Sequence, residues 1–132
     1  MDNLNRAIEI AKASLENAHA PYSKHYVGAA LVCKNGNIYS GANIENHGIM
    51  SICAERVAFC KAISEGDKDF DYIVVCGGKD INNLESCLPC GYCRQFMNEF
   101  VDEHFIIYAL EANDKLTPYT INDLLPYGFK LK

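Results

Sequence analysis

Two short apolar runs, residues 72–76 and 105–110, place the strongest constraint on what this chain can fold into. Each has the length of one strand, and an unbroken apolar run is typical of a strand that is buried on both faces. Between them Pro89 opens a helix with a core-facing apolar stripe at i, i+3, i+4, i+7 and i+8. The stripe consists of Cys93, Phe96, Met97, Phe100 and Val101. A strand, a helix and a strand in this order predict a parallel pair with a right-handed crossover.

The N-terminal part of the chain predicts a helix followed by a hairpin. Apolar residues at helical spacing indicate a first helix over roughly 3–18, which Pro21 stops. The dipeptide Asn35-Gly36 stands between the apolar runs 27–33 and 38–42. An Asn-Gly pair in this position is a strong hairpin signal, because Asn and Gly tolerate the positive φ angles that tight turns require.

A second helix, apolar on several sides and therefore central, ends at Gly66. Together the elements predict one α/β layer sandwich. From Thr117 to Lys132 the chain is interrupted by Pro and Gly, and no element is predicted there. The length of 132 residues predicts a single domain over residues 1–132.

Composition excludes several classes of protein. With 49% hydrophobic and 22% charged residues the chain is typical of soluble globular proteins. A net charge of -5 without a basic run argues against a nucleic-acid partner. No apolar stretch approaches the roughly 18–20 residues that span a bilayer, so we expect no membrane association. Seven cysteines, an odd number, and an N-terminus without a signal-peptide pattern predict reduced thiols and a cytoplasmic location.

The densest group of reactive side chains lies in a segment with cysteines at positions 87, 90 and 93. Two thiolates one helical turn apart at a helix start can bind one Zn²⁺, since the turn brings both sulfurs to one side and the helix N-terminus favours deprotonation. Cys90 and Cys93 have this placement. With Cys87 the run also fits an iron–sulfur cluster, and Cys53 as a fourth ligand would give a closed, structural zinc site of four cysteines.

A second motif, Cys53-Ala54-Glu55-Arg56, stands at the start of the central helix. A thiolate from Cys53 would leave zinc with three sulfur ligands and one open position, with the Glu55 carboxylate beside it as general acid and base. An isolated Glu here is more often a first-turn acid that favours the helix dipole, but beside a ligand cysteine we favour the catalytic interpretation. Three thiolates over-neutralise Zn²⁺. We therefore expect Arg56 to donate hydrogen bonds to them rather than to lie on the surface.

These motifs make the chain similar to the cytidine deaminase family. Cys53-Ala54-Glu55, followed by the stretch from Pro89 to Gln95 (PCGYCRQ), resembles the zinc signature of the small, all-cysteine members of the family. The resemblance covers almost the whole chain in family order, with further segments at 20–23, 27–31, 41–46, 62–66 and 124–126. It implies a three-layer α/β/α sandwich with a central mixed five-stranded sheet.

The resemblance also implies an activity, a cofactor and an assembly. The activity would be hydrolytic deamination of cytidine and 2′-deoxycytidine to the uridine nucleosides and ammonia, as in pyrimidine salvage, by a homotetramer. Cys53, Cys90 and Cys93 would bind one Zn²⁺ per chain, and Glu55 would shuttle protons. Because one carboxylate serves several proton transfers, we expect burial to bring the pKa of Glu55 nearer neutrality than that of a free glutamate.

Further positions match residues that contact the nucleoside in family members. Asn43 and Glu45 match an Asn-x-Glu motif that hydrogen-bonds the ribose hydroxyls, although without the family this segment is typical of a turn after a strand. The backbone N–H of Ala54 would meet the pyrimidine carbonyl. Phe129 matches a C-terminal aromatic residue that family members place in the active site of a neighbouring subunit.

The chain departs from the family pattern at His25-Tyr26, where members usually have Phe-Pro and that Phe stacks on the base. His25 could stack as a flat ring, Tyr26 could take the position, or the pocket could be weaker or differently selective. Cys87 has no role in the family pattern, and we interpret it as a non-ligand thiol.

Two alternatives to a cytidine deaminase remain open. A relative acting on another amino-heterocycle, such as a blasticidin-type nucleoside or a free base, is the nearest one, and Asn43 with Glu45 argues against it because the pair fits a ribose. A polynucleotide substrate is disfavoured by the net charge of -5. The alternative from another class is a non-catalytic metal protein with four cysteine ligands.

Overall fold

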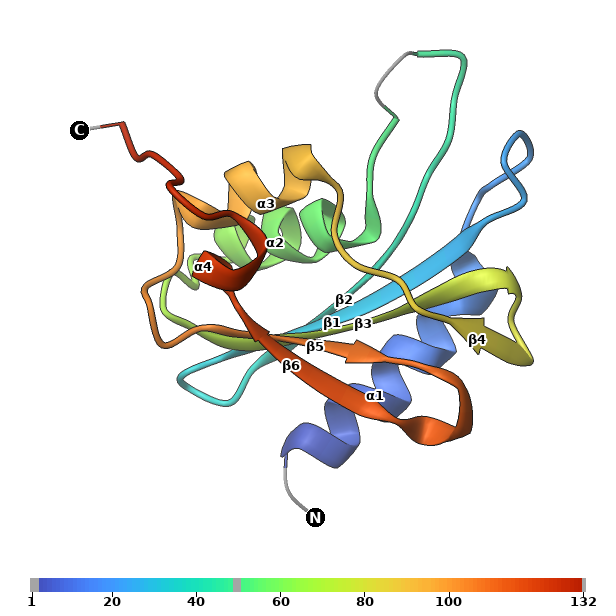
Figure 1. The fold of residues 1–132 in the computed structure, drawn as a ribbon, viewed down its shortest axis with the longest axis horizontal. Coiled ribbons are helices and arrows are strands. Elements are labelled where there is room, and N and C mark those ends of the chain that lie inside the picture. Colours follow the sequence, from blue (N-terminus) through green and yellow to red (C-terminus); the bar gives the residue numbers. More distant parts are fainter. Residues whose placement is uncertain (1–2, 49–50, 132) are drawn as a thin grey trace.

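The structure, a computed structural model, describes residues 3–48 and 51–131 (Figure 1). In order its helices and strands are α1 (Asn3–Ser14), β1 (Tyr26–Cys33), β2 (Ile38–Ala42), α2 (Ala54–Ser64), β3 (Phe70–Asp80), β4 (Asn83–Glu85), α3 (Gly91–Asn98), β5 (Ile106–Leu110), β6 (Leu116–Thr120) and α4 (Ile121–Leu124). Two strands follow each of the helices α1, α2 and α3 along the chain. Short 3-10 turns lie at Leu15–Asn17 and Ala112–Asp114.

The strands form one mixed sheet in the order β2-β1-β3-β5-β6. The predicted parallel pair is confirmed, since β3 and β5 run parallel with Val74 opposite Tyr108. The predicted hairpin is also confirmed, because β1 and β2 pair antiparallel on either side of Asn35-Gly36. Beyond the five strands of this path, the short strand β4 pairs antiparallel with the end of β3 and brings the sheet to six strands.

Helices cover both faces of the sheet, as the three-layer prediction requires. In Figure 1 the helices α2 and α3 lie on one side of the sheet and α1 lies on the other. The core under α2 and α3 contains large side chains from these helices, from the sheet and from the segment before β5, among them Phe59, Ile73, Met97, Phe105 and Ile107. The core under α1 contains many small residues, among them Ala7, Ala11, Ala30, Val32 and Val74, together with Leu15 and Leu110. The alternation of β1 and β3 divides their side chains between the two cores.

Two predicted helices are shorter than the sequence pattern indicates. The first ends at Ser14, whose hydroxyl donates to the Ile10 carbonyl at 2.8 Å, and the chain then tightens into a 3-10 turn rather than continuing to residue 18. The helix predicted from Pro89 begins after its N-cap Cys90 and ends at Asn98. Val101 is buried in the turn that follows, whereas Phe100 is 42% exposed and does not belong to the core stripe.

The C-terminal stretch, for which the sequence predicted no element, contains the edge strand β6 and the helix α4. Pro118 is tolerated in β6 because an edge strand leaves one side of its backbone unpaired. Thr120 and Asp123 form a capping box that starts α4: the Asp123 N–H donates to Thr120 Oγ1, and the Thr120 N–H donates to Asp123 Oδ2. Ile121 and Leu124 then pack into the core under α2 and α3.

Residues 3–48 and 51–131 contain no helix that is both long enough and apolar enough to cross a lipid bilayer.

Candidate active site

Two helices of the same layer begin at one cluster of sulfurs. Cys53 is the N-cap of α2, Cys90 is the N-cap of α3, and Cys93 is the third residue of α3. The Sγ–Sγ distances are 3.7 Å between Cys53 and Cys90 and 3.6 Å between Cys90 and Cys93, and all three sulfurs lie within 4.8 Å of one another. In a tetrahedral zinc site with Zn–S bonds of about 2.3 Å, two sulfurs lie about 3.8 Å apart. The cluster therefore has the spacing of zinc ligands and leaves one tetrahedral position for another group.

The surroundings of Cys53 favour its thiolate form. Hydrogen bonds from Cys93, Arg56 and Cys90 lower the pKa of Cys53 to about 5, although burial opposes the shift. The contact with Cys53, together with burial, raises the pKa of Cys93. The N-termini of α2 and α3 add positive potential at both N-cap cysteines. Cys53 is thus the first cysteine of the cluster to ionise. The thiolate is the form in which cysteine binds a metal.

Arg56 lies next to the sulfur cluster. Its Nη2 atom is 3.6 Å from Cys53 Sγ and 3.4 Å from the Ser51 carbonyl oxygen. The side chain is 9% exposed, and its Nε is the buried side-chain polar atom that has no hydrogen-bond partner among the described residues. A guanidinium in this place offsets part of the charge that three thiolates would bring to a divalent ion.

A cavity of about 370 Å³ opens beside the cluster. Residues in its lining that the sequence singled out are His25, Asn43, Glu45, Cys53, Ala54, Glu55 and Cys90. Glu55 is 3% exposed, and burial raises its pKa to about 7, as expected for a group that both accepts and donates protons near neutral pH. Ala54 is the first residue of α2, where a backbone N–H has no acceptor within the helix.

Asn43 lines this cavity and also fixes the start of β1. Its Oδ1 accepts a hydrogen bond from the Val27 N–H at 2.9 Å, and its Nδ2 donates to the His25 carbonyl at 2.8 Å. The amide group retains a second N–H and a second lone pair. Asn43 can therefore hold the backbone and still offer a polar group to a ligand.

The Glu45 carboxylate also makes hydrogen bonds within the chain, to Tyr22 and Ser23. Its Oε1 accepts hydrogen bonds from the Tyr22 and Ser23 backbone N–H groups at 3.0 and 3.1 Å. The Ser23 hydroxyl donates to Oε2, and these bonds with Ser23 and Tyr22 lower the pKa of Glu45. The Ser23 hydroxyl also accepts from the His25 N–H at 3.0 Å, which joins His25 to the same network. Glu45 is therefore ionised at neutral pH and remains a strong acceptor.

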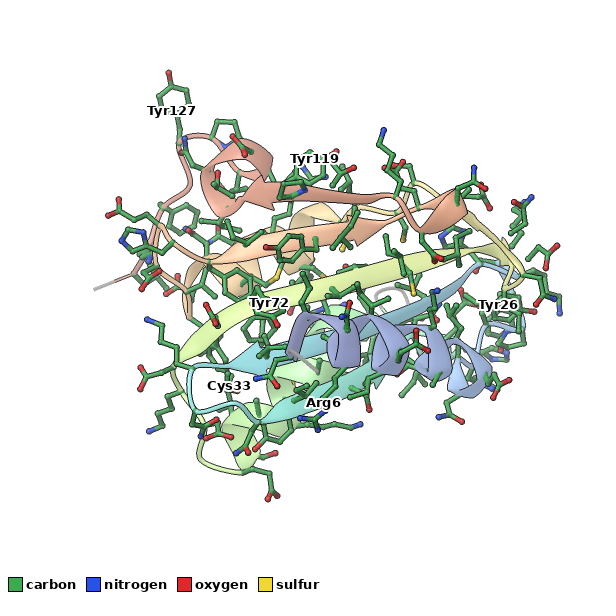
Figure 2. The ribbon with its side chains drawn as sticks, turned by 90° about the horizontal axis from the view of Figure 1, so that it is seen from below. Arg6, Tyr26, Cys33, Tyr72, Tyr119 and Tyr127 are labelled. Atoms are coloured by element: carbon green, nitrogen blue, oxygen red, sulfur yellow. The ribbon has the colours of Figure 1, made fainter. Side chains whose placement is uncertain are left out.

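Of the two residues at the departure from the family pattern, His25 faces the cavity and Tyr26 does not. Tyr26 packs against the core under α1, and Figure 2 shows it on the α1 side of the sheet. The possibility that Tyr26 takes the stacking position is therefore wrong, because its side chain lies on the α1 face of the sheet and the cavity opens on the α2 face. His25 Nε2 lies 3.9 Å from Cys87 Sγ, within the lining of the cavity.

Cys87 lies outside the group of three sulfurs that could hold a metal. It is buried beside His25, and burial raises its pKa to about 12, so that it is a neutral thiol at pH 7. This arrangement favours a three-thiolate site over the closed site of four cysteines.

Phe129 does not reach the cavity of its own chain. Its side chain is 62% exposed and lies by Tyr92 and Phe96 on the outer side of α3. Its carbonyl accepts hydrogen bonds from Gln95 and Asn98 at 3.1 and 3.0 Å. These bonds fix the backbone of the C-terminal segment on α3 and leave the ring at the surface.

A larger hollow of about 590 Å³ lies on the other face of the sheet, between α1, the β3–β4 turn and the β5–β6 connection. Its lining includes Lys12 and Asp114, which pair with each other at 2.7 Å. Volume alone does not identify a reactive site. The smaller cavity combines the thiol cluster with a carboxyl group of raised pKa, and it is the candidate active site.

Comparison with known proteins agrees with this geometry. The sequence model of a family described as "Cytidine and deoxycytidylate deaminase zinc-binding region" matches residues 1–109. The chain belongs to the cytidine and deoxycytidylate deaminase family. The three-sulfur cluster of this deaminase lies inside the matched region, and its donors suit zinc, which binds thiolates.

Relatives of this deaminase are named for two different substrates. A cytidine deaminase of Sporosarcina psychrophila is 39% identical over 128 residues, which is 96% of this chain and 91% of the relative. A blasticidin-S deaminase of Bacillus cereus is 34% identical over 129 residues, 92% of this chain and 91% of that one. The crystal structure of cytidine deaminase from Burkholderia pseudomallei superposes with a TM-score of 0.85 at 36% identity, covering 95% of this chain and 98% of that one.

Two glycines in the sheet let helices of the deaminase approach it closely from opposite sides. A Cβ atom on Gly41 of β2 would lie 2.1 Å from the Ala54 carbonyl oxygen in the first turn of α2. A Cβ on Gly28 of β1 would lie 2.2 Å from the Ala11 carbonyl oxygen in α1. Gly41 therefore sets the distance between β2 and the first turn of α2, which carries Glu55. Gly28 sets the distance between β1 and α1 on the other face.

We predict that Gly41→Ala and Gly28→Ala have different effects on metal binding. Each added methyl group overpacks a helix–sheet contact and should lower the free energy of unfolding by about 1–3 kcal/mol. Gly41→Ala should also reduce zinc bound per folded chain, because it displaces the N-terminus of α2. Gly28→Ala is the matched control and should keep its zinc. Denaturant unfolding and metal analysis of the folded fraction measure both effects, and equal zinc contents in the two variants would contradict this role of Gly41.

The neutral thiol of Cys87 leads to a second prediction about metal content. Cys87→Ser should retain one zinc per chain, whereas Cys90→Ser should lose most of it, because only Cys90 belongs to the cluster of sulfurs. Both substitutions replace one sulfur by oxygen, so they are matched in size. Loss of zinc from Cys87→Ser would instead support a closed site of four cysteines.

Proposed function

We propose that this chain catalyses hydrolytic deamination of cytidine and 2′-deoxycytidine to uridine and 2′-deoxyuridine plus ammonia, a reaction of pyrimidine salvage. The observation that carries the proposal is Glu55. It is a buried carboxyl group with a pKa raised to about 7, and it lies in a cavity beside three sulfurs with the spacing of zinc ligands. Relatives named cytidine deaminase support the choice of substrate.

Cys53, Cys90 and Cys93 would hold the zinc, one ion per chain. When bound, zinc would supply the ability to make a water molecule a competent nucleophile at neutral pH. Glu55 accepts a proton from the attacking water and donates it to N3 of the pyrimidine, which makes C4 electrophilic. The same carboxylate then relays the second proton of the water to the departing amino group, so that cytidine and water give uridine and ammonia. A pKa near 7 suits this role, because the group must accept and release protons with similar ease.

Residues of the cavity wall orient the nucleoside in this proposal. Asn43 and Glu45 would bind the ribose hydroxyls, and the Ala54 N–H would bind the pyrimidine carbonyl. Each keeps hydrogen-bonding capacity beyond its contacts within the chain. The His25 ring would stack on the base in place of the phenylalanine of family members. The cavity of about 370 Å³ lies within the usual range for sites of small ligands.

We further propose that residues 1–132 form one catalytic domain in the cytoplasm. The C-terminal elements support the single domain, since Ile121 and Leu124 pack into the same core as α2 and α3. The cysteines support a reducing compartment: all seven are free, and a zinc site of three thiolates requires reduced sulfur.

Assembly into a homotetramer completes the proposal. The C-terminal segment exposes large apolar side chains, with Tyr127, Phe129 and Leu131 at 100%, 62% and 79% exposure, and Figure 2 shows Tyr127 projecting away from the fold. Burial of such side chains at a subunit contact would be favourable. Since Phe129 lies outside the cavity of its own chain, a role at the nucleoside would require the cavity of a neighbouring subunit.

The central test is the ultraviolet change when cytidine is added to purified, zinc-replete protein. Wild type should give the spectrum of uridine and release ammonia. Glu55→Gln removes the proton carrier at nearly constant volume, and its rate should fall by at least about 10²–10⁴-fold while fold and zinc content remain. Near-normal turnover by this variant would remove Glu55 from the mechanism.

The same assay decides between the two substrate classes. Blasticidin S serves as the competing amino-heterocycle, since one relative is named for it. Faster turnover of the antibiotic than of cytidine, with zinc bound, would overturn the proposed substrate and leave the reaction type intact.

Sedimentation tests the assembly. We expect a homotetramer, and Phe129→Ala should lower activity, whereas Phe129→Tyr, which keeps the ring, should retain it. A fully active monomer would contradict both the tetramer and the contribution of Phe129 to a neighbouring site.

A further inference from the structure

One aromatic ring joins the first turns of the two helices that carry the sulfur cluster. The guanidinium carbon of Arg56 lies 4.1 Å from the centroid of the Tyr92 ring. Arg56 is the third residue of α2, and Tyr92 is the second residue of α3, between Cys90 and Cys93. The contact therefore spans the gap between α2 and α3 beside the thiolates.

The Tyr92 ring is one of few groups that contact the Arg56 guanidinium. The Nη2 bonds to Cys53 Sγ and the Ser51 carbonyl are long, at 3.6 and 3.4 Å, and Nε has no partner among the described residues. No salt bridge in the part of the chain that the structure describes includes Arg56. Cys93 is a further hydrogen-bond partner of the guanidinium. With no carboxylate there to fix its position, the guanidinium is held by two sulfurs, one carbonyl and the Tyr92 ring.

The Tyr92 ring covers one face of the Arg56 guanidinium and is itself more exposed than Arg56. The Arg56 side chain is 9% exposed, whereas Tyr92 is 49% exposed. A cation over an aromatic face gains about 0.5–2 kcal/mol, more when water is excluded. The attraction between two charges rises as their separation and the local dielectric fall, so a guanidinium held dry against a sulfur stabilises the thiolate more than a hydrated one.

We propose that Tyr92 is a positioning residue for the zinc site: its ring holds the Arg56 guanidinium against Cys53 Sγ and so sets how tightly the three thiolates retain zinc. The inference rests on the zinc site of the proposed function, but it does not depend on which substrate the enzyme deaminates. The part of Tyr92 that acts is the aromatic face. The hydroxyl group is not needed.

The test is zinc affinity, measured by competition with a chromogenic chelator. Tyr92→Leu removes the aromatic face and should raise the dissociation constant for zinc about tenfold, at the low end of the effect of an outer-shell partner. Tyr92→Phe keeps the face and should stay within about twofold of wild type. Tyr92→Gln is a second non-aromatic variant in case the leucine variant does not fold. Thermal unfolding and sedimentation of each variant verify fold and assembly.

A double-mutant cycle with Arg56→Gln separates this role from packing. When the guanidinium is absent, Tyr92→Leu should have no further effect on zinc affinity. An equal loss of affinity in both backgrounds would overturn the inference, because Tyr92 would then act independently of Arg56. So would a Tyr92→Leu variant that binds zinc as tightly as wild type. A wild-type chain that binds no zinc would overturn the proposed function and this inference with it.

Discussion

The structure depends on the convergence of three cysteine sulfurs at the N-termini of two helices. Three thiolates placed within 4.8 Å of one another would repel, so a cluster that is to ionise and bind a metal needs positive potential around it. The α2 and α3 termini and Arg56 supply that potential. The helices begin at the same place because β3 and β5 run parallel, and a parallel crossover puts α3 on the face of the sheet that α2 also covers. The parallel arrangement of the strands thus brings the positive N-termini of both helices to the sulfur cluster.

The residues proposed to bind the nucleoside also hold the cavity in shape. The Asn43 amide makes hydrogen bonds to the backbone at the start of β1, as a neighbouring strand would. Glu45 accepts hydrogen bonds from the backbone N–H groups of Tyr22 and Ser23. This dual use makes the cavity rigid before a ligand arrives, which reduces the entropy lost on binding. It also means that a substitution of either residue would alter the wall as well as the contact, so that its kinetic effect is not a measure of one hydrogen bond.

The outer side of α3 connects the metal site to the C-terminal segment. Tyr92 faces Arg56 and also borders the hollow that contains Phe129 and Leu131. A subunit packed on this segment would therefore lie close to the guanidinium that contacts Cys53. Tyr92 would then contribute both to the subunit contact and to zinc binding. The neighbouring subunit would shield its exposed surface from water.

Local spacing in the sequence determined the hairpin at Asn35-Gly36, the central helix and the pairing of Cys90 with Cys93, because helical and strand periods fix such relations within a few residues. The order of strand, helix and strand predicted the parallel pair. The motif Cys53-Ala54-Glu55 at a second helix start indicated the third sulfur. The family resemblance added Asn43, Glu45 and the substrate. Only the tertiary structure decided that Cys87 lies by His25 rather than with the other sulfurs, that Tyr26 faces α1, and that Tyr92 stacks on Arg56. These contacts join residues up to 62 positions apart, and their geometry depends on how the helices rest on the sheet, at close approaches such as Gly41, which no local pattern of residues specifies.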